Sequence, residues 1–347
     1  GVLTGTSLDI SGDIDVDGTT NLDVVDIDGA VDMASTLQVD GAITFSSTLN
    51  GLDILADTTN FVDSILISQN ASTGTLSSAS NNTGLGDSVF AALTSGVDNT
   101  IVGGLAGDAL TTGSRNVAIG RSALSLDTQG SSTVAIGFGA LDAQNFTSAT
   151  DTYNTAVGRS AGGAITTGIK NTIVGGLAGD AITTADNNTA VGMSALGATT
   201  TGASNVAIGQ GSLQTNTTAS NNTAVGFSAL NVNTTGTANV AVGALALDAN
   251  TTANYGTAIG YEALTTNTTG AYNTGVGFYA LRLNTTGTEN TASGVGALGA
   301  NTTGSYNCGY GSGALDANTT ASNNTAMGFN ALGANTTGDN LVAVGAN

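Results

Sequence analysis

The fold is decided by a 17-residue phrase that is clearest at Asn222-Thr223-Ala224-Val225-Gly226-Phe227-Ser228-Ala229-Leu230, continues with Asn233-Thr234-Thr235-Gly236 and begins again at Asn239. We name Gly226 and its equivalents the anchor glycines. Successive anchors are 17 residues apart, except for one interval of 21. Because sixteen anchors keep this register, the chain repeats one structural unit. The anchors are Gly86, Gly103, Gly120, Gly137, Gly158, Gly175, Gly192, Gly209, Gly226, Gly243, Gly260, Gly277, Gly294, Gly311, Gly328 and Gly345.

Seventeen residues are too few for two ordinary helices, and each phrase contains a short β-prone segment. Thr223-Ala224-Val225 predicts a strand of about three to four residues. The pair Ala229-Leu230 supplies a second strand or a corner, and the intervening Gly and Asn residues tolerate the left-handed backbone of tight corners. The sequence therefore predicts an all-β parallel β-solenoid, or β-roll, whose 17-residue coils stack about 4.8 Å apart into a rod of roughly 75 Å.

Each position of the repeat forms a column when the coils stack. The residue one before the anchor is apolar in 14 of 16 coils, so we predict that this column faces the interior. The residue four before the anchor is Asn in 13 of 16 coils, and stacked amides of this kind can hydrogen-bond along the solenoid. The structural residues predicted from these columns include Gly120, Gly209, Gly226, Gly243 and Gly277 at corners, and Asn116, Asn205, Asn222, Asn239 and Asn273 in a ladder.

Three coils replace the leucine of the Ala-Leu pair with glycine. In each of them an apolar residue appears three places later, so we expect the coil to keep its core residue by shifting it along the chain. The pairs are Gly107 with Leu110, Gly162 with Ile165, and Gly179 with Ile182.

The break in register lies between Gly137 and Gly158, where one coil is four residues longer than the others. A stacked strand cannot absorb four residues, whereas a surface turn can. We therefore predict an outward loop around Phe146 to Thr152, with the strands before and after it still in register. This loop is either a tolerated insertion or a receptor contact.

Residues 1–80 differ in kind from residues 81–347, and we predict a domain boundary between them. Segments such as Asp13-Ile14-Asp15-Val16-Asp17 alternate apolar and acidic residues at the period of a strand, which indicates a looser acidic β-repeat shaft. The carboxylates of Asp13, Asp15 and Asp17 are candidates for calcium ligands. Alternating carboxylates are more typical of a solvated strand face, so we predict no metal and no cofactor.

The composition excludes several classes of function. The chain has 25 acidic and five basic residues, a net charge of −20, no His and a single Cys, Cys308. The lack of His argues against acid/base catalysis near neutral pH, and the lack of basic clusters argues against nucleic acid as a partner. One thiol cannot form a disulfide within the chain or complete a zinc or iron-sulfur site. We find no membrane-spanning run or signal peptide, and we expect no membrane insertion.

Aromatic residues recur in two columns, one just after the anchor and one five residues before it. They are candidates for a stripe that contacts a receptor or carbohydrate, with packing between chains as the favoured alternative. The Asn-x-Thr triplets match glycosylation acceptors, but their register favours a role in turns and ladders. Stacked threonines could form an ice-binding array, although threonine also simply suits strands and turns. The candidate receptor contacts are Phe146, Tyr153, Phe227, Tyr261, Tyr272 and Phe278.

The phrase at Asn222 to Gly236 resembles the repeats in tail-fibre proteins of marine bacteriophages, and Asn324 to Gly338 carries the same phrase with one substitution. The strand phrase Asn205-Val206-Ala207-Ile208-Gly209 is also similar to the head repeats of trimeric autotransporter adhesins, which form parallel β-rolls. The resemblance covers residues 81–347. It implies an extracellular protein on a virion or cell surface.

We therefore expect a non-enzymatic structural fibre, a homotrimer of identical chains that contacts a host or environmental surface, including its glycans. A bacterial surface adhesin or extracellular filament subunit of the same architecture is the first alternative. A carbohydrate-processing tail spike is a third reading, and it would need paired carboxylates in a groove. One acidic column recurs five residues after the anchor without a well-populated partner column, at Asp108, Asp142, Asp180, Asp248 and Asp316.

Overall fold

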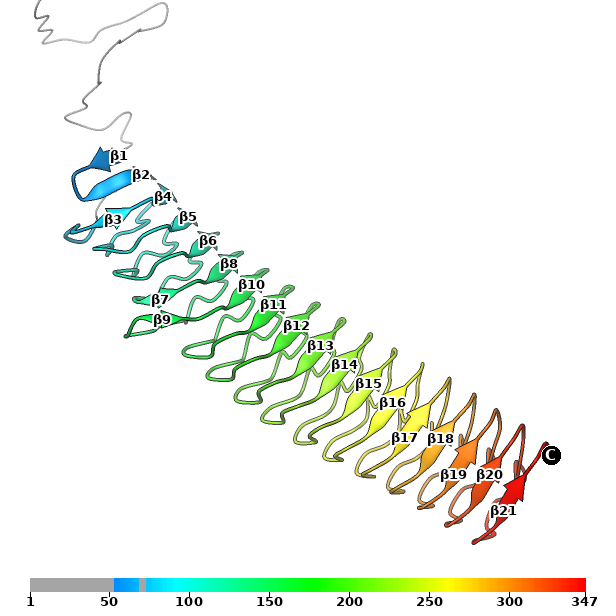
Figure 1. Ribbon diagram of the computed structural model, residues 1–347. Coiled ribbons are helices and arrows are strands. Elements are labelled where there is room, and N and C mark those ends of the chain that lie inside the picture. The colour runs from blue at the N-terminus through cyan, green and yellow to red at the C-terminus, as the bar shows by residue number, and fades with distance from the viewer. Residues whose placement is uncertain (1–52, 69–72) are drawn as a thin grey trace, which may run out of the picture. The chain divides into compact units, whose positions relative to one another are not determined.

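The computed structural model describes residues 53–68 and 73–347, which form a parallel β-solenoid of about 16 coils with no helix among them (Figure 1). The predicted solenoid and its 17-residue spacing are confirmed. The strands are β1 (Asp53–Thr58), β2 (Phe61–Ser68), β3 (Ala79–Ser80), β4 (Thr83–Leu85), β5 (Thr100–Val102), β6 (Val117–Ile119), β7 (Gly130–Ser131), β8 (Val134–Ile136), β9 (Thr150–Asp151), β10 (Thr155–Val157), β11 (Thr172–Val174), β12 (Thr189–Val191), β13 (Val206–Ile208), β14 (Thr223–Val225), β15 (Val240–Val242), β16 (Thr257–Ile259), β17 (Thr274–Val276), β18 (Thr291–Ser293), β19 (Cys308–Tyr310), β20 (Thr325–Met327) and β21 (Val342–Val344).

The strands of successive coils pair in parallel and in register. In β13 and β14, for example, Val206 lies opposite Thr223 and Ile208 lies opposite Val225. Strands of three residues cannot bury an apolar face alone, so each is stabilised by the coils above and below it. Figure 1 shows these strands stacked along one side of the solenoid.

The N-terminal end of the described sheet is a hairpin rather than a coil. Strands β1 and β2 pair antiparallel, and β2 then pairs in parallel with β3 and β4. Hydrogen-bonded pairing with the coils therefore extends N-terminal to residue 81. Most of the predicted acidic shaft, including the calcium candidates Asp13, Asp15 and Asp17, lies outside the described residues.

The core consists of two layers of small and branched side chains. The residue two before the anchor, such as Ala224, is fully buried, and so is the Ala-Leu pair, such as Ala229-Leu230. The prediction for the residue one before the anchor is wrong, because this column faces outward and Ile208 and Ile259 are about two-fifths exposed. A shift of one residue exchanges the two faces of a strand. The leucines fill the space opposite the strand, which leaves room for only a small inward side chain.

Two coils show this exchange of volume directly. Where glycine replaces the leucine at Gly107 and Gly179, the inward strand residue is Ile101 or Ile173 instead of alanine. A Cβ at Gly179 would lie 3.0 Å from the Ile173 Cδ1 atom and 2.9 Å from Ile182 Cδ1. The shifted apolar residues Leu110, Ile165 and Ile182 are all fully buried, as predicted. The interior therefore holds its packing by redistributing side chains around the coil.

The Ala-Leu pair lies in a turn and forms a corner, not a second strand. Leu230 has a φ of 51°, in the left-handed region that costs an L-residue with a Cβ about 1–2 kcal/mol. Burial of its side chain, worth roughly 1.5–3 kcal/mol, offsets this cost.

The anchor glycines stand where each strand ends at a corner. Gly226 has a φ of 139°, and a Cβ on it would lie 2.5 Å from the carbonyl oxygen of Gly243 in the next coil. Both the backbone conformation and the close approach of the next coil therefore require glycine. Gly120, Gly209, Gly243 and Gly277 have the same geometry.

The asparagines four residues before the anchor form a buried ladder. The Asn222 backbone N–H donates to Asn205 Oδ1 at 3.0 Å, and Asn222 Nδ2 donates to the Gly236 carbonyl at 2.9 Å. These bonds satisfy amides that are fully buried and would otherwise destabilise the fold. Asn116 and Asn273 make the equivalent contacts within the same column.

The asparagine of the Asn-Thr-Thr-Gly turn forms a second internal ladder. Asn250 Nδ2 donates to Asn233 Oδ1 at 2.7 Å, and Asn233 Nδ2 donates to the Gly236 carbonyl. The hydroxyl of Thr234 donates to the Thr251 carbonyl of the next coil at 3.0 Å. The turn-and-ladder interpretation of the Asn-x-Thr triplets is therefore confirmed where these residues repeat, since Asn233 and Asn250 are fully buried.

The longer coil forms an outward loop while the sheet stays in register. Val134 of β8 lies opposite Thr155 of β10, and the short strands β7 and β9 pair in parallel beside them. The exposed residues are Thr147, Ser148, Ala149 and Asp151, whereas Phe146 and Thr152 at the ends of the predicted loop are buried. The insertion is thus placed correctly, but its exposed part is shorter than predicted.

Candidate binding surface

The outward face of the sheet carries no charged residue in the two columns that form it. One column is Thr or Val in nearly every coil, and the other is mostly Val or Ile. Val242 and Val276 are each 36 % exposed and lie beside equivalent side chains of the neighbouring coils. A long uncharged face with a column of partly exposed Val and Ile side chains is suited to contact another macromolecule. We name these two columns the sheet face.

The two aromatic columns lie at the two ends of the strands, on either side of the sheet face. Tyr255 and Tyr272 stack with ring centroids 5.1 Å apart, and Tyr261 and Phe278 stack at 5.7 Å. Each pair comes from adjacent coils, so the repeat itself sets the ring spacing. Such stacked, solvent-facing rings present flat apolar faces joined to polar hydroxyl groups.

The structure exposes five of the six predicted contact residues. Tyr153, Phe227, Tyr261, Tyr272 and Phe278 are all exposed, with exposed fractions of 44–59 %. The sixth, the ring of Phe146, turns inward and is 8 % exposed, so its proposed role as a contact is corrected. Removal of a large apolar ring from water is favourable, which accounts for the buried position of Phe146.

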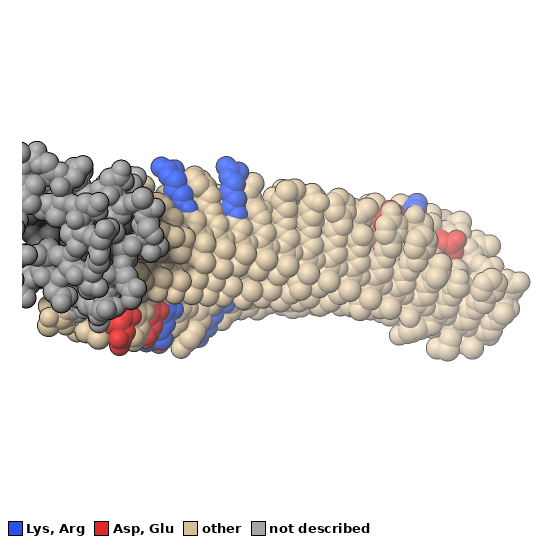
Figure 2. All heavy atoms as spheres, turned by 90° about the horizontal axis from the view of Figure 1, so that it is seen from above, with Lys and Arg blue, Asp and Glu red and all other residues tan. Residues whose placement is uncertain are grey.

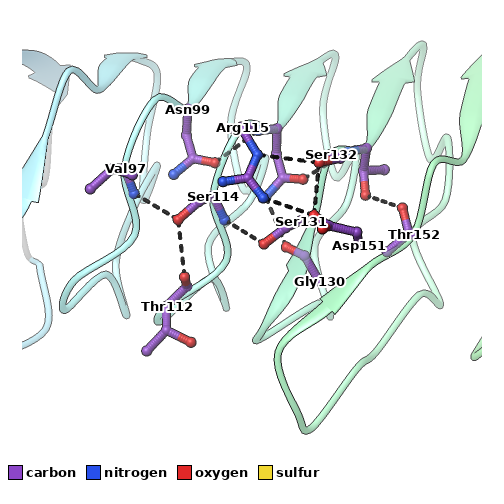
Figure 3. A network of polar contacts seen from close by, with 12 residues as sticks. Val97, Asn99, Thr112, Ser114, Arg115, Gly130, Ser131, Ser132, Asp151 and Thr152 are labelled. Carbon is purple, nitrogen blue, oxygen red and sulfur yellow. Dashed lines mark hydrogen bonds and ion pairs between the residues drawn. The ribbon is translucent and has the colours of Figure 1, made fainter.

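A polar network ties the longer coil to the coils before it (Figure 3). The guanidinium of Arg115 donates to Asp151 Oδ1 at 2.8 Å, and the hydroxyl of Ser132 donates to the same oxygen at 2.9 Å. The hydrogen bond from Arg115 is the main cause that holds the pKa of Asp151 below its usual value. Asp151 and Arg115 are both exposed, so this pair contributes little to stability but fixes the position of β9.

Beneath the same coil lies a buried polar cluster. Gln144 Nε2 donates to Asp127 Oδ2 at 2.7 Å, and Asn154 Nδ2 donates to Gln144 Oε1 at 2.8 Å. The backbone N–H groups of Gly130 and Phe146 also donate to Asp127. All these groups are satisfied internally, so the cluster has a structural role in holding the insertion.

Four of the five basic residues lie between positions 115 and 170, and Arg282 stands alone further along the chain. Arg121 lies over the ring of Phe138 at 6.0 Å. On the face drawn in Figure 2, charged side chains are few and stand apart over the C-terminal half of the solenoid.

Four aspartates of the acidic column five residues after the anchor are partly buried, whereas Asp316 is exposed. Burial raises the pKa values of Asp108, Asp142, Asp180 and Asp248 above the usual value for aspartate. For Asp248 the hydrogen bond from Thr265 opposes this shift, and the charge of Glu262 adds to it. Glu262 belongs to another column, two residues after its anchor, so the acidic column itself has no well-populated partner column.

An open hollow of about 210 Å³ lies on the turn side of the coils, where the sequence analysis predicted no site. Its lining includes Tyr279, Arg282, Leu283 and Asp316. In these coils the second and fifth positions after the anchor depart from the common Ser and Asp. One coil has Tyr279 and Arg282 at these positions, and the next coil has Gly296 and Gly299. This change of residue type is the signal by which the sequence could have revealed the hollow.

Within residues 53–68 and 73–347, no three His, Cys, Asp or Glu residues cluster as metal ligands would. That part of the chain also contains no helix long and apolar enough to span a membrane. No protein-family model and no curated protein matches the chain.

Proposed function

We propose that the chain is a non-enzymatic structural fibre of a virion, such as a phage tail fibre, and that it contributes to attachment at a host surface outside the cell. The observation that carries this proposal is the sheet face. It runs along the stacked coils, carries no charge and leaves Val and Ile side chains partly exposed. An enzyme would require a reactive constellation, whereas a repeating face of this kind suits assembly.

The proposed assembly is a trimer of identical chains with the sheet faces turned toward one another. Each coil would then bury its outward Val or Ile, gaining about 25 cal/mol per Å² of apolar surface removed from water. The gain is small for one coil and accumulates over about 16 coils. The net charge of −20 would act against side-by-side aggregation beyond the trimer.

In this proposal the exposed aromatic residues serve as contacts to the host or environmental surface, including glycans. Tyr153, Phe227, Tyr261, Tyr272 and Phe278 are the residues concerned. Where a ring lies close enough to the sheet face, it would instead pack between chains.

A bacterial adhesin or filament subunit of the same architecture is the alternative function. The genes next to this one distinguish the two, because virion genes would surround a tail fibre. The tail-spike reading rests on the recurring acidic column that includes Asp248. If the chain is a tail spike, it should release reducing ends from a polysaccharide, and Asp248→Asn should abolish that release.

Two lysine substitutions test the assembly. Val242 lies on the sheet face and Val232 lies on the turn side, and their exposed fractions are similar at 36 % and 41 %. We expect Val242→Lys to dissociate the trimer in sedimentation velocity and Val232→Lys to leave it intact. Equal behaviour of the two variants would show that the sheet face is not the interface.

A further inference from the structure

We infer that the hollow bounded by Tyr279, Arg282 and Asp316 is a binding site for one residue of a neutral glycan. The inference deepens the proposed attachment function and rests on it for its biological role. Its chemistry rests on three observations: an aromatic wall, an unpaired charge of each sign, and a space kept open by glycines. We name this hollow the Tyr279 pocket.

The aromatic wall of the hollow is the ring of Tyr279, which belongs to a cluster of three rings. The Phe278 and Tyr279 rings have centroids 3.8 Å apart, and Tyr279 lies 5.9 Å from Tyr261 of the preceding coil. The pocket is therefore continuous with an exposed aromatic column. Flat rings of this kind pack against the apolar C–H face of a sugar, while the tyrosine hydroxyls can bond to its polar edge.

The pocket has two charged side chains, of which Arg282 is held by the Tyr279 ring and Asp316 is exposed. The Arg282 guanidinium carbon lies 4.5 Å from the centroid of the Tyr279 ring, which orients its donors. Among the described residues, Arg282 forms no ion pair, and the ion pair there joins Arg115 to Asp151. No described side chain donates a hydrogen bond to the Asp316 carboxylate. A ligand would thus meet several N–H donors and a carboxylate acceptor.

The space between these charges exists because of glycine. Arg282, Gly299 and Asp316 occupy equivalent positions in three successive coils, so the missing side chain lies between the two charged ones. A Cβ at Gly299 would lie 2.8 Å from Asp316 Oδ1, and Gly296 also lines the hollow. A side chain at position 299 would therefore crowd the Asp316 carboxylate and reduce this space.

Charge and size define the ligand class. A donor and an acceptor on one side of a ring-lined hollow match the vicinal hydroxyls of a sugar, which both donate and accept hydrogen bonds. An acidic sugar would be repelled by Asp316 and by the net charge of −20. A volume of about 210 Å³ is below the roughly 300–1,000 Å³ of pockets for drug-sized ligands, so the pocket holds a single sugar residue.

The solenoid also provides a matched control site. A hollow of about 300 Å³ lies at the same place in earlier coils and is lined by Asp180, Gly197 and Gln214. It has the glycine and the carboxylate but no aromatic ring and no arginine. Comparison of the two hollows therefore distinguishes binding that depends on Tyr279 and Arg282 from binding to any hollow with a carboxylate.

The test uses the full chain on an array of neutral and acidic oligosaccharides, followed by NMR titration with methyl glycosides of the hexoses. We expect binding to neutral sugars. Arg282→Gln and Asp316→Asn should each weaken it about tenfold or more, as expected for hydrogen bonds to charged groups, and Asp180→Asn should leave it unchanged. Circular dichroism and the melting temperature check that each variant keeps its fold, and Tyr279→Ser provides a further variant.

Absence of neutral-sugar binding, binding of acidic sugars alone, or equal effects of Asp180→Asn and Asp316→Asn would overturn the inference. The outcome is separable from that of the fibre proposal. The pocket residues lie on the turn side of the coil, away from the sheet face, so a Val242→Lys chain that fails to assemble should still bind the sugar. Sugar binding by a parent chain that forms no trimer would support the Tyr279 pocket and contradict the proposed trimer.

Discussion

Asn239 is hydrogen-bonded to Asn222 of the preceding coil and to the backbone of the following coil, and this ladder of bonds keeps the coils in register. Its backbone N–H donates to Asn222 Oδ1 at 2.9 Å, its Nδ2 donates to the Ala253 carbonyl, and its own Oδ1 accepts from the Gly256 N–H at 2.8 Å. One amide therefore satisfies groups in its own coil and in two neighbouring coils. This cross-linking by buried polar groups replaces much of the large apolar core that a globular domain would have.

Breaking this ladder should be costly. Asn222→Leu removes both the acceptor for the Asn239 N–H and the donor to the Gly236 carbonyl, and leaves two buried groups unsatisfied. We expect a loss of about 2–4 kcal/mol in the free energy of unfolding, measured by chemical denaturation. Asn145→Ala, at an exposed asparagine, is the control and should change stability little. Equal stability of the two variants would show that the ladder does not stabilise the solenoid.

The anchor glycines should tolerate no side chain. In Gly226→Val the new Cβ would collide with the backbone of Gly243, and the positive φ would disfavour valine independently. We expect a loss of about 3 kcal/mol or more, seen as a lower melting temperature. Gly176→Ala is the matched control, because a Cβ there meets no atom within 4 Å. A Gly226→Val chain that melts like Gly176→Ala would refute the corner assignment.

Acidification should stabilise the fold. Burial raises the folded-state pKa values of Asp108, Asp142, Asp180 and Asp248 above the unfolded value near 3.8, so the folded chain binds more protons than the unfolded chain. The free energy of unfolding then rises as the pH falls through these raised pKa values toward the unfolded value. The lowered pKa of exposed Asp151 acts in the opposite direction, but at lower pH.

We therefore expect the melting temperature to rise as the pH is lowered from 7 toward the unfolded value near 3.8, with a smaller rise in Asp248→Asn. That variant should also be more stable than the parent at pH 7, because it removes a carboxylate that is ionised in a partly buried site. A melting temperature that falls steadily on acidification would contradict this reasoning.

In the longer coil, we expect the exposed tip, Thr147 to Ala149, to be dispensable for stability and the buried Phe146 to be required. Deletion of exposed Thr147 to Ala149 should leave the melting temperature nearly unchanged. Phe146→Ala should cost about 3 kcal/mol, because the large ring is buried and its loss leaves a cavity. The reverse ranking would show that the loop, and not the ring, holds this coil. Loss of surface attachment by the folded deletion variant would identify the tip as a contact.

The sequence was sufficient to predict the register of the coils, the polar ladder and the corners. A 17-residue period and an asparagine four residues before the anchor specify a stack directly, since equivalent residues of successive coils lie one strand spacing apart. The place of the insertion followed from the same logic. A stacked strand such as β10 must keep its partners, so the extra residues had to enter a turn.

The direction of the strand side chains could not be read in the same way. In Thr223-Ala224-Val225 the larger apolar residue, Val225, faces outward, because the leucines from the corner fill the interior opposite Ala224. Size alone predicted the wrong face. The Tyr279 pocket was missed for a related reason: it arises from residues in three coils, where Gly299 leaves a gap between Arg282 and Asp316.

The central claim is that identical chains bury the outward face of the sheet. Sedimentation equilibrium of the intact chain at micromolar concentration tests it most directly. We expect a species with three times the mass of one chain, stable on dilution and lost in Val242→Lys but not in Val232→Lys. A folded, soluble monomer of the parent chain at that concentration would contradict it.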